Sequence, residues 1–156
     1  MSDNELRIRL AQAEASDLQA LSAMNRALIE DEGSRNSMSA AELEQRMAEW
    51  LANGWRAALF ELDEATVGYA LFEMRRDEYD DALEEAYIRQ FYIDRSRRRT
   101  GIGAAAFDRL RSELFPKSAT ISLEVLAANH GAYCFWRRLG LAPYCTTLKL
   151  SGDPAS

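Results

Sequence analysis

The sequence has few of the residues that build metal centres, disulfide frameworks and membrane segments. It contains two cysteines, one histidine and three prolines in 156 residues. Cys134 and Cys145 lack the spacing of metal ligands and are expected to be reduced apolar side chains. The single histidine, His130, is expected at the surface, and no apolar run reaches the length of a membrane helix. The sequence therefore predicts neither a metal site nor a membrane span.

Positive charge is also scarce. The chain has 19 Lys and Arg against 25 Asp and Glu, a net charge of -6. Such a balance argues against nucleic acid or an anionic membrane as a partner. Residues 1–5 have neither the basic end nor the apolar run of a leader, so a cytoplasmic location is expected. The length predicts one domain over residues 1–156, with a disordered tail at 152–156.

The spacing of apolar residues predicts alternating strands and helices. Ser16 or Asp17 is expected to cap the first helix, and Gly33 to end it. The acidic stretch 75–85 is expected to be a loop. The expected strands cover residues 6–10, 55–62, 66–73, 86–93, 120–126 and 142–150, and the expected helices cover residues 17–32, 37–52, 102–114 and 131–139.

A short basic and glycine-containing run, Arg98 to Gly103, lies between an expected strand and an expected helix. Gly101 and Gly103 have no Cβ, so the backbone can turn sharply and a ligand can approach closely. The first amides of the helix have no acceptor within the helix and favour a phosphate. Arg98 and Arg99 add charge that is kept at any working pH. The run predicts a site for a diphosphate-bearing cofactor.

A dinucleotide-dependent oxidoreductase is an alternative, because Gly101-x-Gly103-x-x-Ala106 fits the loose dinucleotide fingerprint. Two thirds of the chain precede this turn, however, and only one further strand and helix unit follows it, which is unlike a dinucleotide fold. No Gly-Lys-Ser/Thr follows the glycines, which excludes a nucleoside-triphosphate loop.

The order of elements and two spaced motifs resemble the GNAT superfamily of acyl-CoA-dependent N-acetyltransferases. Arg98-x-x-Gly101-x-Gly103 is similar to the family's pyrophosphate motif. Asn129, followed by Phe135-Trp136 and Leu139-Gly140-Leu141, is similar to its second motif. The resemblance implies an α/β (α+β) fold with a mixed, mostly antiparallel twisted sheet, splayed central strands and about four helices. It also implies acetyl-CoA as co-substrate and no metal.

By this resemblance the pantetheine arm lies between the splayed strands and bonds to the main chain of Phe91 and Ile93. An amide near Phe91 would hold the acetyl carbonyl where negative charge develops during attack by an amine. The cofactor-binding residues expected from the resemblance are Phe91, Ile93, Arg98, Arg99, Gly101, Ile102, Gly103, Asn129 and Trp136.

Two departures from the family affect the catalytic residues. The family often has a tyrosine where this chain has Trp136, and an indole is a poor proton donor to a thiolate. Tyr133 is therefore the expected acid. Glu85 is the expected base, because the following strand lacks the glutamate that the family often has. The missing tyrosine keeps open an alternative: a catalytically weak acyl-CoA-binding or protein-interaction module of the same fold.

Two acidic segments predict the acceptor. Glu30, Asp31 and Glu32 end the first helix, and the loop over residues 77–85 is also acidic. In the GNAT arrangement the first segment lies near the acceptor entrance, and an anionic entrance attracts cations. We expect a cationic primary amine, on a small molecule or on a protein or peptide, with Arg89 also at this site. The alternative is that these charges only keep the protein soluble, and a homodimer is compatible with the sequence.

Overall fold

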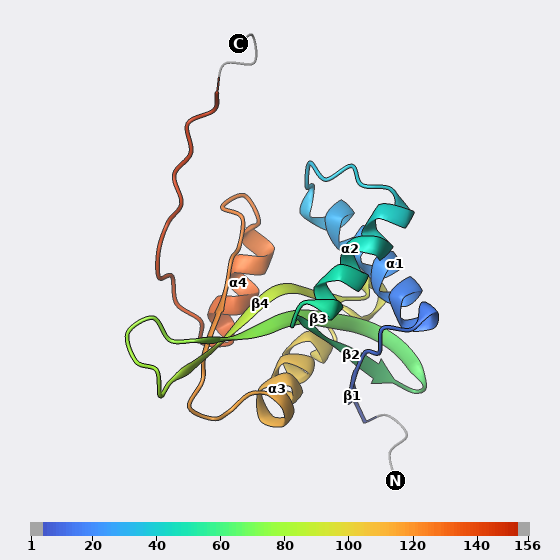
Figure 1. Cartoon of the computed structure of the whole chain (residues 1–156), viewed down its shortest axis with the longest axis horizontal. Coiled ribbons are helices and arrows are strands. Elements are labelled where there is room, and N and C mark those ends of the chain that lie inside the picture. Colours follow the sequence, from blue (N-terminus) through green and yellow to red (C-terminus); the bar gives the residue numbers. More distant parts are fainter. Residues whose placement is uncertain (1–4, 153–156) are drawn as a thin grey trace. The chain divides into compact units, whose positions relative to one another are not determined.

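The computed structural model describes residues 5–152. The chain divides into two compact units, a first unit up to Glu124 and a second unit from Val125 onward. Figure 1 shows the elements of both units. In the first unit these are β1 (Arg7–Leu10), α1 (Ala15–Glu32), α2 (Ala40–Ala52), β2 (Arg56–Leu62), β3 (Ala65–Arg76), β4 (Glu84–Ile93), the short 3-10 helix η1 (Arg95–Arg97), α3 (Ile102–Leu114) and β5 (Thr120–Leu123). The second unit contains α4 (His130–Arg138).

One five-stranded sheet, in the order β1-β2-β3-β4-β5, forms the centre of the first unit. The first four strands pair antiparallel with their neighbours, whereas β4 and β5 are parallel. The register of β5 covers only residues 85–88 of β4, so residues 89–93 of β4 continue beyond the paired region. The mixed, mostly antiparallel sheet is confirmed.

The helices of the first unit cover both faces of this sheet (Figure 1). On one face, Leu21 of α1 and Met47 of α2 join a fully buried cluster with Tyr69 and Leu71 of β3. On the face covered by α3, the ring of Phe115 packs edge-on against Phe72, with 5.0 Å between centroids. Burial of these side chains supplies the hydrophobic free energy that holds the helices to the sheet.

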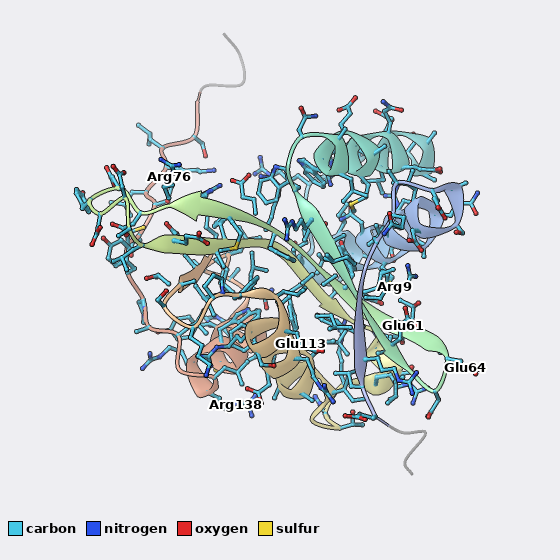
Figure 2. The ribbon with its side chains drawn as sticks, turned by 60° about the horizontal axis from the view of Figure 1, so that its bottom comes forward. Arg9, Glu61, Glu64, Arg76, Glu113 and Arg138 are labelled. Carbon is cyan, nitrogen blue, oxygen red and sulfur yellow. The ribbon has the colours of Figure 1, made fainter. Side chains whose placement is uncertain are left out.

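The start of α1 differs from the sequence prediction. Neither Ser16 nor Asp17 caps the helix, whose N-cap residue is Glu14, without a side-chain hydrogen bond. The Asp17 carboxylate instead accepts two hydrogen bonds of 3.0 Å from the Arg9 guanidinium and one of 2.8 Å from the Gln12 amide. This bidentate, charge-assisted pair is a stronger partner than a helix amide. Arg9 also contacts Glu61 on the neighbouring strand, at 2.7 Å (Figure 2).

The predictions for one loop and two strands were wrong. The loop predicted over 75–85 is shorter. Arg75 pairs with Glu85, so β3 continues to Arg76 and β4 already begins at Glu84. β5 ends at Leu123 rather than at residue 126. Residues 142–150 form no strand, since the described part of the chain offers them no ladder partner and apolar alternation alone does not make a strand. Of the tail predicted to be disordered, residues 153–156 lie outside the described residues.

No helix within residues 5–152 combines the length and the apolar character that crossing a bilayer requires.

Candidate functional site

The segment between β4 and α3 forms a tight turn rich in arginine. Asp94 caps η1 by accepting a hydrogen bond from the Ser96 amide. Arg99 and Gly101 then adopt left-handed backbone conformations, with φ of 63° and 85°. Gly101 is the N-cap residue of α3 and supplies no side-chain acceptor. The turn therefore brings the basic segment and the amino-terminal amides of α3 to one place, which is the arrangement that binds phosphates.

Arg98 is held in position by three contacts. Its Nε donates to the main-chain oxygen of Ile93 at 2.9 Å, and its guanidinium lies 5.5 Å from the Tyr92 ring centroid. It also forms an ion pair with Asp31 at the end of α1, as does Arg95. Burial acts to raise the pKa of Asp31, but the guanidinium groups of Arg98 and Arg95 outweigh it and hold that pKa below its ordinary value. Asp31 therefore stays charged and anchors the basic turn.

Open space borders this turn. A Cβ built on Gly101 would meet no atom within 4 Å. A surface cavity of about 530 Å³ lies beside it, with Arg97, Thr100, Gly101 and Ile102 among its lining residues. The backbone of the turn is thus accessible to a ligand of the size of a diphosphate.

A bulge in β4 lies where the strand diverges from β5. Leu71 pairs with Gln90 and Phe72 pairs with Ile88, so Arg89 is the extra residue. Beyond the bulge, the Phe91 ring packs against Phe60 with 5.5 Å between centroids. Bulges redirect side chains and interrupt pairing beside active sites.

A partly buried cluster of polar side chains joins α1, α2 and the sheet. The Tyr69 hydroxyl donates to Gln90 Oε1 at 2.7 Å, and Arg46 Nη2 donates to Asn25 Oδ1 at 3.1 Å. Burial, followed by the charge of Glu32, raises the pKa of Tyr69 well above its ordinary value. Burial and the charge of Asp31 also raise the pKa of Glu32. Glu32 is exposed, its charge acts on Tyr69, and it is easier to protonate than an ordinary carboxylate.

Aromatic rings and arginines adjoin this cluster. Trp55 contacts both Trp50 and Tyr87, with centroid distances of 6.4 and 6.2 Å. Arg75 lies 4.0 Å from the Tyr87 centroid. Burial, with a further contribution from the charge of Glu124, raises the pKa of Tyr87. Of the residues in this region, the sequence predicted only Arg89 and Glu32 as site residues. Asn25 and Arg46 were missed, although they are polar residues within otherwise apolar helix stripes.

Glu85, the predicted base, lies at the other end of β4. Its carboxylate accepts a hydrogen bond from the Ser122 hydroxyl on β5. Phe91 lies six positions further along the strand, a distance of about 20 Å. Glu30, the remaining acidic residue predicted at the acceptor entrance, is exposed near the end of α1. Asp31 thus contacts the basic turn that follows β4, whereas Glu85 lies at the opposite end of this strand.

The second unit carries the remaining predicted site residues. Asn129 is the N-cap of α4, and its side chain accepts a hydrogen bond of 3.1 Å from the Ala132 amide. Trp136 packs edge-on against Phe135, with 4.8 Å between ring centroids. Tyr133 is exposed one turn into the helix. Asn129 therefore caps α4.

Comparison with known proteins agrees with this geometry. The family model described as "Acetyltransferase (GNAT) family" matches residues 22–141. No curated protein matches the chain by sequence.

Solved structures share the fold over nearly the whole chain. A possible acetyltransferase from Clostridium difficile 630 has a TM-score of 0.76 and 16% identity, with 95% of this chain and 97% of that chain covered. A predicted acetyltransferase with acetyl-CoA from Clostridium acetobutylicum has a TM-score of 0.70 and 20% identity, covering 94% and 96%. An aminoglycoside acetyltransferase from an uncultured soil metagenomic sample, in complex with sisomicin, has a TM-score of 0.67 and 18% identity, covering 95% of each chain.

The family match spans most of the chain and includes the strand, the basic turn and the helix that follows it. The architecture of the sheet agrees with the solved structures. The chain belongs to the GNAT family of acetyltransferases.

Proposed function

We propose that this protein transfers an acetyl group from acetyl-CoA to a primary amine by direct attack in a ternary complex. The observation that carries the proposal is the basic turn at the end of β4, beside the point where β4 and β5 diverge. A family relative of the same fold was solved with acetyl-CoA. The whole chain would act as one acetyltransferase domain.

The residues of the turn fit a pyrophosphate. Arg98 and Arg99 supply charge, and the left-handed conformation of Gly101 exposes the amides that begin α3, including those of Ile102 and Gly103. No side chain blocks the space over Gly101. Asn129 and Trp136 are the proposed contacts from the second motif.

Bound acetyl-CoA would supply the thioester that the amine attacks. The main chain of Phe91 and Ile93, in the part of β4 without a β5 partner, is proposed to hold the pantetheine arm. A fixed amide donor there stabilises negative charge on the acetyl oxygen, because it needs no reorganisation during the reaction. Tyr133 is the proposed donor of a proton to the departing thiolate.

An amine must lose a proton before it attacks. An unperturbed lysine amine has a pKa of about 10.4, so presenting it neutral at pH 7 requires about 4.6 kcal/mol, and a base or a water relay is expected. Glu85 is one candidate, acting through water because of its distance along β4. Glu32 is the second, favoured by its raised pKa and by the action of its charge on Tyr69.

The acceptor is proposed to bind on the α1 and α2 side of β4. Glu30 and Glu32 would attract its ammonium form, whereas Asp31 is already engaged by Arg95 and Arg98. The aminoglycoside acetyltransferase relative was solved with sisomicin, which supports a small-molecule amine.

Thermal unfolding with acetyl-CoA tests the cofactor site. Saturation at about a hundred times Kd stabilises by about 2.7 kcal/mol, which corresponds to about 5–10 °C in Tm for a domain of this size. Gly103→Val should abolish the shift, because a branched side chain would occupy the space of the pyrophosphate. Ser112→Val, on the exposed face near the end of the same helix, is the matched control and should keep the shift. An undiminished shift in a folded Gly103→Val protein would refute the site.

A further inference from the structure

Two arginines from different elements converge on one tryptophan ring in the first unit. The guanidinium carbon of Arg46, on α2, lies 4.4 Å from the Trp50 ring centroid, and that of Arg89, in the β4 bulge, lies 4.9 Å from it. Arg89 is also 5.6 Å from the centroid of Trp55. The extra residue of a bulge does not follow the strict alternation of side chains, and here Arg89 lies on the face of the sheet that α2 covers.

This pair of positive charges is not neutralised. Within residues 5–152, neither Arg46 nor Arg89 forms an ion pair with a carboxylate. Burial, and then the like charge of Arg89, lowers the pKa of Arg46. The other arginine of this region, Arg75, is paired with Glu73 at 2.6 Å. The two guanidinium groups therefore have no direct carboxylate partner within residues 5–152, although Glu42 and Glu49 line the same surface depression as Arg46.

The same place holds a polar donor without an acceptor. Arg46 Nε is buried and has no hydrogen-bond partner among the described residues, whereas the Asn25 side chain also interacts with the Tyr69 hydroxyl. Asn25 is completely buried, and its only oxygen already accepts from Arg46. Native proteins rarely leave buried donors unsatisfied, and such groups call for an explanation. The unpartnered nitrogen of Arg46 is a donor, which fits a ligand that accepts hydrogen bonds.

We propose that the amine acceptor also carries a small anionic group, a carboxylate or a phosphate, and that Arg46 and Arg89 bind this group beside Trp50. The inference rests on the proposed acetyltransferase function and names the class of its acceptor. Arg89 is two residues from Phe91, about 7 Å along the strand, so the anion and the reacting amine would belong to one small molecule of amino-acid size. Attraction of its ammonium group by Glu32 is compatible with this arrangement.

Matched acceptors test the anionic group. Thiol release is measured with free amino acids, with their amides, with the corresponding decarboxylated amines, and with ethanolamine against phosphoethanolamine. A charge-assisted hydrogen bond contributes about 1.5–3 kcal/mol, so kcat/KM should be at least about tenfold higher for the acids than for their amides. Phosphoethanolamine as the better substrate would identify a phosphate instead of a carboxylate. Equal rates for each acid and its amide would overturn the proposal.

Variants of Arg89 separate binding from stability. Arg89→Gln should raise KM for the anionic acceptor at least about tenfold, leave KM for its amide unchanged, and be partly rescued by Arg89→Lys. Arg111→Gln is the matched control, because Arg111 also lies over an aromatic ring, 5.7 Å from the Phe107 centroid on α3. An equal effect of Arg89→Gln on acid and amide would contradict the assignment.

A binding measurement distinguishes failure of this inference from failure of the proposed function. Trp50 and Trp55 should change fluorescence when an amino acid binds, and its amide should have a much smaller effect. Acetylation without preference for anions would overturn the inference alone. Anion binding without acetylation of any amine would refute the proposed function and retain the anion site. If neither anion binding nor acetylation is observed, both the inference and the proposed function are overturned.

Discussion

Because β3 and β4 approach each other closely at Gly68, adding one methyl group at this position should lower the stability of the protein strongly. A Cβ built on Gly68 would lie 2.1 Å from the main-chain oxygen of Tyr92 and 3.1 Å from the Cα of Ile93. Both atoms belong to the backbone, so no side chain can move aside, and the two strands would have to separate by about 1 Å. Overpacking of this kind destabilises by about 1–3 kcal/mol or more. Gly68→Ala should therefore lower Tm by about 2–12 °C.

The same displacement should reach the cofactor. Ile93, the partner of Gly68 in the sheet, provides the main-chain oxygen that holds Arg98. Folded Gly68→Ala protein, tested well below its Tm, should bind acetyl-CoA more weakly in calorimetry. Gly152→Ala is the control, because a Cβ at Gly152 meets no atom within 4 Å and its φ needs no glycine. A Gly68→Ala protein that melts within about 1 °C of the parent would refute the close packing described here.

Three further predictions concern stability and pH. The Arg9 guanidinium holds the pKa of Asp17 below its ordinary value, so this carboxylate stabilises the fold above about pH 4 and loses its contribution as the pH falls further; Asp17→Asn should lower the urea midpoint at pH 7 and have a smaller effect at acidic pH. Ser39 and Glu42 form a capping box at the start of α2, and Ser39→Ala should cost about 1 kcal/mol in urea unfolding, with Ser37→Ala as a control that changes little. If Glu32 is the base, its raised pKa makes the rate fall as the pH drops through that pKa, and Glu32→Gln should remove this acidic limb; a limb that persists in Glu32→Gln but disappears in Glu85→Gln would place the base on β4 instead.

The local order of strands and helices could be predicted from the sequence because short-range patterns determine it. The apolar spacing of α1, α2 and α3 follows the period of a helix. Gly33 ends α1 as predicted, and it does so in a left-handed conformation. The basic turn was also predictable, because its glycines and arginines are contiguous.

Long-range partners account for the differences. Asp17 was predicted to cap α1 from its local sequence, but its carboxylate binds Arg9, eight residues away. The end of β3 and the start of β4 depend on the pairing of Arg75 with Glu85, which local propensity does not encode. The cluster of Asn25, Arg46 and Arg89 comes from three separate elements, and no spacing within the sequence brings these residues together.

Analysis of the products formed from isotopically labelled acetyl-CoA and a panel of amines tests the central claim most directly. The account predicts that the labelled acetyl group appears on the amine nitrogen in an amount equal to the thiol released, and that Gly103→Val abolishes both products while Ser112→Val retains them. Thiol release without an acetylated amine, or no transfer to any amine despite binding of acetyl-CoA, would contradict it.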